Sequence, residues 1–308
     1  MRSGRDDAAT TGRKPHRMWK KALAGVASLG LLASVAGCAE AGDDGDTITF
    51  FEVPGFDDTE AMTALWTVLL EEQGITLETT SIDLAAGFTG IADGSVDGYV
   101  NAWLPSTHEQ VLANYKEDVV IVDEDGEGYF HENENVLVVP EYVEHDTIEE
   151  ALADPELFGG EIIGIEDGSG LMTMLPDTIA AYDATDDFEV VSGSTPAMLT
   201  SLQGAIDDQE PILVTLWNPH WAFAEMDLKV LEDNKDGWPE PDGSYFVVSK
   251  EFDESHPEIV EWFANSQVTQ EEYSTLMHAV SQAETPVDGA RTWLEDESNR
   301  ATVDSWFA

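Results

Sequence analysis

Short apolar runs alternate along the chain with longer segments in which apolar residues recur at helical spacing. Thr47–Val53 is rich in β-branched and aromatic residues, which predicts a strand, and Asp57–Gln73 has the apolar period of a helix that ends before Gly74. Ile75–Ile82 predicts a second strand. The order strand, helix, strand is the unit that builds a parallel sheet, so the pattern predicts an α/β chain.

Further strands and helices continue this alternation to the C-terminus. Short strands are predicted at Val96–Ala102, Val119–Val122, Asn135–Val139, Ile162–Ile165, Glu189–Val191, Ile212–Leu216 and Tyr245–Val248. The last part of the chain predicts helices without strands, at Pro257–Phe263, Thr269–Val280 and Pro286–Glu297. We therefore expect the C-terminal helices to pack onto an existing lobe. A chain of 308 residues suits two lobes of about 100 to 150 residues each.

The first 37 residues differ in kind from the rest. They carry seven of the 13 basic residues and two of the 63 acidic ones, in the order basic (Arg13–Lys21), apolar (Ala22–Val35), then small residues before Cys38. This is the layout of a secretory signal. Its apolar run of about 14 residues is shorter than the roughly 20 that a membrane-spanning helix needs. The sequence predicts a signal peptide at 1–37 and an acidic tether at 38–46.

Cys38 is the single cysteine, so no intramolecular disulfide is possible. Its place after Ser34-Val35-Ala36-Gly37 resembles the lipobox of prokaryotic lipoproteins, in which that cysteine is acylated. The alternative is ordinary signal cleavage at the nearby Ala-x-Ala pattern, with an incidental cysteine. Lipidation is favoured because a lone exported thiol without a role is an oxidation liability.

Beyond residue 37 the chain carries six basic and 61 acidic residues, a formal charge of −55. Such a charge excludes nucleic acid as a partner. Eight of the nine Trp and all twelve Phe lie in this part of the chain, and with its regular apolar periodicity they exclude a disordered acidic chain. Self-repulsion is screened at about 1 M salt, where the Debye length is about 3 Å. The composition therefore indicates a folded protein adapted to high salt.

Aromatic residues next to turn residues follow three of the predicted strands. These segments are Val53–Asp58, Asn101–His108 and Trp217–Trp221. In open α/β sheets ligands bind at the carboxyl ends of strands. Loop aromatics also staple loops to their scaffold, so each segment alone leaves both interpretations open.

A cluster of aromatic faces suits a quaternary ammonium group, which has no hydrogen-bond donor and is held by the negative faces of rings. Three rings at about 0.5 to 2 kcal/mol each supply roughly 1.5 to 6 kcal/mol. Micromolar binding requires roughly 8 kcal/mol. A second set of contacts must therefore hold the other end of the ligand.

The glycine-containing segment Asp167–Met172 is a candidate for that second set. It follows a predicted strand and precedes a helix-like stretch from Met172 to Tyr182, so its backbone N–H groups could face an anion. A plain turn into a helix explains it equally well on local grounds. The segment is neither a Walker A loop nor a dinucleotide fingerprint.

Three longer strings resemble the glycine betaine binding proteins of osmoprotectant ABC importers, the OpuAC-like family. They are VDGYVNAWLPSTH (Val96–His108), EIIGIEDGSGLM (Glu161–Met172) and LWNPHWAFAEMDLKVLED (Leu216–Asp233). The resemblance covers nearly the whole chain beyond the leader. It implies an α/β, two-lobed periplasmic-binding-protein fold (type II) with the ligand in the inter-lobe cleft.

The resemblance also implies roles for individual residues. Trp103 and Trp217 match two tryptophans of the family's aromatic box, and His108 matches its carboxylate-binding histidine. The N–H groups of Gly170 and Leu171 match its backbone contacts to the carboxylate.

The third wall of the box departs from the family, because Phe56 and then Asp58 stand where a Trp-x-Glu string is usual. A phenyl ring is a smaller and weaker face for a cation than an indole. This change lowers the affinity or widens the pocket for a bulkier betaine or choline. Glycine betaine is the first expectation for the ligand, and a choline- or carnitine-type ligand stays open.

Four more residues are candidates for contacts behind the ligand: Asp58, Ser169, His220 and Trp221. For His220 and Trp221, packing under the loop is an equally good interpretation. The remaining histidines lack metal-ligand spacing, so neither a metal site nor a cofactor is predicted.

The sequence predicts no enzyme, because neither a nucleophile elbow nor an H-E-x-x-H string is present. We expect a binding protein at the outer face of the cytoplasmic membrane, anchored at Cys38, that delivers its ligand to an ABC permease by hinge closure. A sensor receptor of the same fold is the alternative. The predicted lobes are 47–138 plus 246–308, and 139–245.

Overall fold

The structure is a computed structural model that describes residues 46–308. The predicted signal peptide, Cys38 and all but the last residue of the predicted tether lie outside the described residues. The strands are β1 (Thr47–Glu52), β2 (Thr76–Ser81), β3 (Gly98–Leu104), β4 (Val119–Ile121), β5 (Phe130–Pro140), β6 (Glu161–Ile163), β7 (Glu189–Val191), β8 (Val214–Asn218), β9 (Leu228–Val230) and β10 (Asp242–Ser249).

The helices lie between these strands and after the last of them. They are α1 (Asp57–Glu72), α2 (Leu84–Asp93), α3 (Glu109–Leu112), α4 (Ile148–Leu152), α5 (Gly170–Ala181), α6 (Thr195–Asp208), α7 (Ala222–Glu225), α8 (Lys250–Ser255), α9 (Pro257–Asn265), α10 (Gln270–Ser281), α11 (Pro286–Trp293), α12 (Glu297–Asp304) and the 3₁₀ turn η1 (Ser305–Phe307).

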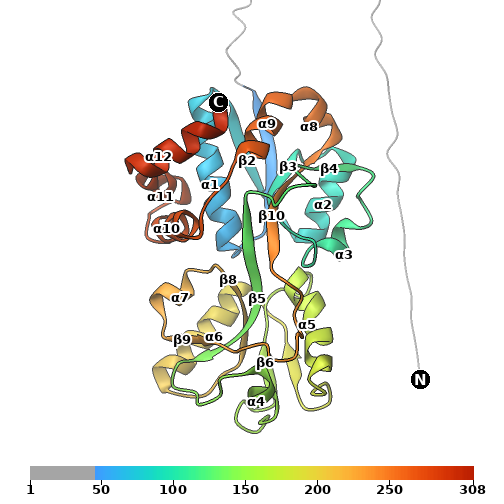
Figure 1. Cartoon of the computed structure of the whole chain (residues 1–308), viewed down its shortest axis with the longest axis vertical. Coiled ribbons are helices and arrows are strands. Elements are labelled where there is room, and N and C mark those ends of the chain that lie inside the picture. Colours follow the sequence, from blue (N-terminus) through green and yellow to red (C-terminus); the bar gives the residue numbers. More distant parts are fainter. Residues whose placement is uncertain (1–45) are drawn as a thin grey trace, which may run out of the picture. The chain divides into compact units, whose positions relative to one another are not determined.

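Residues 46–308 form two lobes joined by β5 and by the segment that leads into β10 (Figure 1). Lobe 1 contains β1 to β4, α1 to α3 and α8 to α12, and lobe 2 contains α4 to α7 and β6 to β9. The strand order is β2-β1-β3-β10-β5-β8-β6-β7, with β4 beside β10 and β9 beside β5. This arrangement is the two-lobed α/β fold that the sequence predicted.

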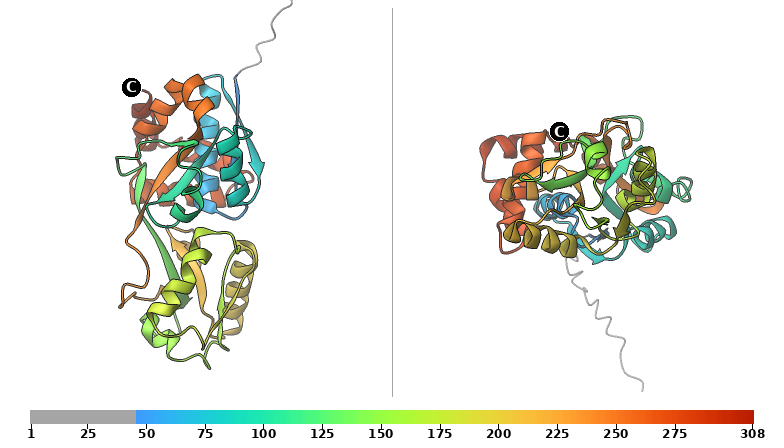
Figure 2. Two further views of the ribbon diagram at one scale, coloured as in Figure 1. Left: turned by 90° about the vertical axis from the view of Figure 1, so that its right-hand side faces the viewer. Right: turned by 90° about the horizontal axis from the view of Figure 1, so that it is seen from below.

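The strand β5 changes partners where it passes from one lobe to the other. Its first half pairs with β10, where Asn133 lies opposite Asp242, and its second half pairs with β8 and β9. Figure 2 shows β5 and the segment that leads into β10 running between the lobes. The exact lobe boundaries predicted from the sequence stay a prediction.

The C-terminal helices cover the outer face of lobe 1, as the sequence predicted. Trp306 stacks on Trp66 of α1 with a ring separation of 5.7 Å. Arg300 of α12 forms an ion pair with Glu72, the last residue of α1. The helix predicted as one segment at 286–297 is wrong in one respect: α11 ends at Trp293, and Asp296 caps the separate helix α12.

Two differences from the predicted strands have simple causes. β5 begins at Phe130, five residues before the prediction, because its first half (FHENEN) is polar and has no apolar run. β9 was missed because it has three residues at the edge of lobe 2. Among residues 46–308, no helix combines the length and apolar character that a membrane crossing requires.

Candidate functional site

A pocket lies where the two lobes meet, with about 340 Å³ of free space including its mouth. Its lining residues come from both lobes: Phe56, Asp58, Thr59, Tyr99, Asn101, Trp103, Thr107, His108, Asn135, Ile165, Ser169, Gly170, Leu171 and Trp217. None of them is a lysine or arginine. A carboxylate in this pocket would therefore be held by N–H groups instead of a cation.

Strand β3 supplies one wall from lobe 1. Tyr99, Asn101 and Trp103 are alternate residues of the strand and line the pocket together. Trp103 is 4% exposed. Leu104 then leads through a cis peptide bond into Pro105.

His108 lies just beyond this wall and is also buried. Its Nδ1 accepts the Trp103 backbone N–H at 2.8 Å, so Nδ1 carries no proton and the ring presents an Nε2–H. Burial lowers the pKa of His108 to about 3. The residue that the sequence linked to a carboxylate is thus a neutral donor that lines the pocket.

The N-terminus of α5 faces the pocket from lobe 2. Ser169 caps the helix by accepting the Met172 N–H at 3.3 Å. The N–H groups of Gly170 and Leu171 belong to the first turn and have no partner within the helix. They are donors on the positive end of the helix dipole, which suits an anion.

Gly170 is required by its close approach to lobe 1. A Cβ at this position would lie 2.1 Å from the backbone oxygen of Thr107. No larger residue fits unless the backbone moves. The contact brings the α5 N-terminus and the segment that carries His108 together at one end of the pocket.

Trp217 and Phe56 form the aromatic side of the pocket across the lobes. Trp217 lies at the end of β8, and its ring centroid is 5.7 Å from that of Phe56 in an edge-to-face arrangement. Within residues 46–308, the buried indole N–H of Trp217 finds no acceptor. Asn218 leads through a cis peptide bond into Pro219, as Leu104 does into Pro105.

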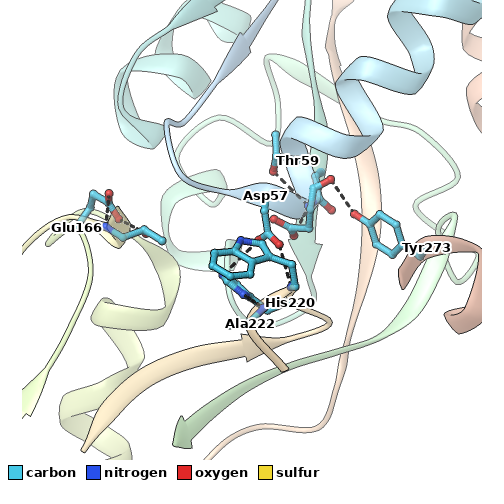
Figure 3. A network of polar contacts seen from close by, with 10 residues as sticks. Asp57, Thr59, Glu166, His220, Ala222 and Tyr273 are labelled. Atoms are coloured by element: carbon cyan, nitrogen blue, oxygen red, sulfur yellow. Dashed lines mark hydrogen bonds and ion pairs between the residues drawn. The ribbon is translucent and has the colours of Figure 1, made fainter. Parts of the chain in front are cut away.

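Asp58 is the one carboxyl group among the lining residues. Asn101 donates to its Oδ2 at 2.5 Å, and Tyr129 donates to the Oδ1 of Asn101 at 2.8 Å. Burial, and then the neighbouring Asp57, raises the pKa of Asp58. Tyr273 of α10 donates to the Asp58 backbone oxygen, so a C-terminal helix supports this side of the pocket (Figure 3).

Asp57 points away from the pocket and toward lobe 2 (Figure 3). The Trp221 N–H donates to its Oδ2 at 3.3 Å, and His220 Nε2 lies 3.5 Å from its Oδ1. Burial raises the pKa of Asp57 to about 7 and lowers the pKa of His220 to about 3.

The structure thus places the predicted site residues in two groups. Eight of them line the pocket: Phe56, Asp58, Trp103, His108, Ser169, Gly170, Leu171 and Trp217. His220 and Trp221 do not line it. His220 packs against the Trp217 ring at 4.7 Å and meets Asp57. The ligand roles of all these residues stay predictions.

Sequence reasoning missed six lining residues: Thr59, Tyr99, Asn101, Thr107, Asn135 and Ile165. The two-residue period of the β3 strand, counted back from Trp103, could have found Tyr99 and Asn101. Asn135 had no such signal, because its place depends on the point where β5 changes partners. Among residues 46–308, no group of His, Cys, Asp or Glu side chains could hold a metal ion.

Comparison with known proteins gives the pocket its context. Residues 46–296 match the model of the family described as the substrate-binding domain of the ABC-type glycine betaine transport system, OpuAC. The chain belongs to this family. The OpuAC assignment agrees with the resemblance carried by the three tryptophan- and glycine-containing strings.

One curated relative is similar to this chain over part of its length. A glycine betaine/carnitine transport binding protein, GbuC of Listeria monocytogenes, is 33% identical over 140 residues, which are 45% of this chain. The match spans about half of that relative, 47% of its length.

Solved structures are similar over most of the chain. Lactococcal OpuAC in its closed conformation with glycine betaine is 28% identical, with a TM-score of 0.76, over 85% of this chain and 100% of its own. A glycine/betaine/L-proline-binding protein (ProX) of Borrelia burgdorferi is 24% identical, with the same TM-score, over 85% of this chain and 96% of its own. The second likeness concerns the fold alone.

Proposed function

We propose that this protein is the extracytoplasmic substrate-binding protein of an ABC importer and that it captures glycine betaine or a related quaternary-ammonium compound. One observation carries the proposal. A single pocket has aromatic faces from both lobes and, in the same space, N–H donors from the α5 N-terminus, which have no partner within their helix, and from His108.

The two kinds of wall match the two ends of a betaine. Phe56, Trp103 and Trp217 offer ring faces to a trimethylammonium group, which cannot donate a hydrogen bond. The N–H groups of Gly170 and Leu171 and the Nε2–H of His108 offer donors to a carboxylate. Ser169 supports these donors as the helix cap, and Asp58 brings the one carboxyl group among the lining residues.

Binding across two lobes couples capture to closure. Lobe 1 (proposed as 47–138 plus 246–308) brings Phe56, Trp103 and His108, and lobe 2 (139–245) brings Gly170, Leu171 and Trp217. A ligand that contacts both lobes stabilises the closed state by the difference in its affinity for the two states. The closed form is then the species that an ABC permease recognises.

We further propose that the protein is exported and tethered through a lipid on Cys38, on the resemblance of Ser34–Cys38 to a lipobox. The 61 acidic residues beyond the leader support a surface adapted to high salt. Both proposals fit the accumulation of a compatible solute against external salt. The family is one of transport substrate-binding domains, and we propose no catalytic step.

A ligand panel tests the proposed function. The purified protein is titrated in about 2 M salt, which screens its surface charge, and tryptophan fluorescence is followed. The ligands are glycine betaine, proline betaine, carnitine, choline and plain glycine. We expect saturable changes with one or more methylated compounds and none with glycine. A folded sample that ignores all the methylated compounds would refute the proposal and point to Phe56 as the origin of a different specificity.

A further inference from the structure

The segment from Pro54 to Asp58, which carries Phe56 and enters the first turn of α1, is held by lobe 2 on two sides. On one side, Gly55 has a φ of +94°, and a Cβ there would lie 3.0 Å from the Cβ of Thr195. Glu166 of lobe 2 fixes Thr195 through hydrogen bonds to its N–H and its hydroxyl, both at 2.9 Å. A left-handed glycine without a side chain lets the two lobes approach at this point.

On the other side, Asp57 meets the segment that follows Trp217. Besides the Trp221 N–H, its carboxyl group faces His220, whose Nδ1 accepts the Ala222 N–H at 3.0 Å. The His220 proton is therefore on Nε2, which points at Asp57 Oδ1 across 3.5 Å (Figure 3). Both of these atoms are buried, and neither has another partner among residues 46–308.

Two buried polar atoms that face each other across a lobe boundary lose water when the lobes meet. They regain it when the lobes separate. A second polar contact joins the same two lobes, where Gln282 after α10 donates to Glu225 of α7 at 2.6 Å. The residues that follow Trp217 thus meet lobe 1 at two points, Asp57 and Gln282.

We propose that Asp57 is a positioning residue for ligand capture: it holds the Trp217–Ala222 segment of lobe 2 against lobe 1 and thereby assembles the aromatic box across the closed cleft. Asp57 does this without lining the pocket. The inference rests on the proposed function. It assigns Asp57 a role in ligand binding that is indirect, because Asp57 positions Trp217 and Phe56.

Closure should also be linked to a proton. The raised pKa of Asp57 comes first from burial, so it returns toward the ordinary aspartate range when lobe 2 moves away. Closure then takes up a proton between that range and about pH 7, and its free energy becomes less favourable as pH rises through this window.

Other titratable groups near Asp57 could add their own pH dependence to closure. Asp58 and Glu60 are on its own helix, His220 faces it from lobe 2, and Tyr273 of α10 lies beyond Asp58. His220 stays neutral throughout this window. Asp58 lines the pocket, so a bound cation changes its protonation as well. The test therefore compares the pH dependence of binding between variants instead of relying on the wild-type pH profile alone.

The test uses Asp57→Asn, Asp57→Ala and the control Asp83→Asn. Asp83 is likewise an aspartate at the start of a lobe 1 helix, where it accepts the Ala86 N–H at 3.0 Å, but it is exposed and lies outside the pocket. Equilibrium affinity and dissociation rate are measured by stopped-flow tryptophan fluorescence with the ligand that the panel identifies. Melting temperature checks that each variant folds.

Asp57→Ala leaves the Trp221 and His220 donors unpaired on closure, so we expect dissociation to be about tenfold faster. For Asp57→Asn, we expect the ratio of wild-type to variant dissociation constants to rise about tenfold between about pH 5.5 and about pH 8. Asp83→Asn should match the wild type in both respects. An unchanged dissociation rate in Asp57→Ala overturns the positioning role, and a ratio that does not depend on pH overturns the proton linkage.

Hydrogen exchange at the Trp221 amide gives a readout that needs no ligand. We expect faster exchange there in Asp57→Ala than in the wild type or in Asp83→Asn. If the wild type binds nothing in the panel, the proposed function fails, and this exchange rate alone decides whether Asp57 holds the two lobes together. Equal exchange in all three proteins would overturn the inference.

Discussion

Two segments of the molecule begin alike and end with different roles. In lobe 1, Trp103 is followed by a cis proline and then by His108; in lobe 2, Trp217 is followed by a cis proline and then by His220. Each histidine is buried, accepts a backbone N–H on Nδ1 and therefore presents an Nε2–H. Their local chemistry is nearly identical.

The difference lies in what each Nε2–H faces. His108 lines the pocket, whereas His220 lies behind the Trp217 ring and meets Asp57. The first histidine follows its tryptophan by five residues and the second by three. The residue type and the tautomer therefore do not assign a role to either histidine. The role depends on the side of the neighbouring tryptophan on which the imidazole ring lies.

The largest effect should come from removing Trp217, which lines the pocket and also packs against His220. We expect Trp217→Ala to lower the affinity for betaine at least about 100-fold, because the ring supplies about 0.5 to 2 kcal/mol to the cation and buries further apolar area. Isothermal titration calorimetry measures this loss.

The matched control for Trp217 is Trp262→Ala. Trp262 is half-buried on lobe 1 and packs on Phe307 at 4.9 Å, and it does not line the pocket. It should leave the affinity unchanged. If Trp217→Ala failed to fold while Trp262→Ala folded, Trp217 would be a core residue and not a wall of the box.

The two histidines should separate in a comparison of ligands. His108→Ala removes a donor to a carboxylate, so we expect it to weaken glycine betaine about 5- to 100-fold and choline much less, since choline has no carboxylate. His220→Ala acts through closure and should weaken both ligands by a similar factor. Equal losses of both ligands in His108→Ala would remove His108 from the carboxylate role.

A smaller effect is expected at Phe56, where the sequence resemblance predicts a phenyl ring in place of the usual tryptophan. Phe56→Trp enlarges the ring face that meets the cation, and we expect it to tighten glycine betaine about two- to fivefold. The same change should favour bulkier betaines less, because it fills part of the pocket. Looser binding of every ligand would show that the phenyl ring is required by the fit to Trp217.

The two imidazole rings should behave alike when pH is varied, because both stay neutral. Burial holds both pKa values near 3, so neither ring should gain a proton between about pH 8 and about pH 5, and the ¹⁵N shifts of both should stay those of a neutral imidazole in NMR spectra. The unfolded chain binds those protons below about pH 6.5, so the free energy of unfolding should fall as pH falls from there toward about 3. A ring that titrates near pH 6.5 would be exposed to water and would not match this account.

Much of the fold was predictable because local patterns agree with the global structure. β1 and α1 follow the predicted strand and helix closely, and Ser169 caps the helix that the glycine segment begins. Trp103 and Trp217 could be found because they lie near the carboxyl ends of strands that meet at the pocket. The resemblance of the surrounding segments to OpuAC strings then predicted glycine betaine or a related compound as the ligand.

What could not be predicted depends on contacts between distant segments. Asp57 reads locally as an acidic residue in the first turn of a helix, which is favourable without any partner. Its contact with Trp221 joins residues 164 positions apart. Asn135 lines the pocket because its strand crosses between the lobes, which no local period records.

A crystal structure of the protein with glycine betaine tests the central claim most directly. The account predicts the trimethylammonium group among the rings of Phe56, Trp103 and Trp217, and the carboxylate at the N–H groups of Gly170 and Leu171 and at His108 Nε2. A ligand in the reverse orientation, or one bound outside this pocket, would contradict it.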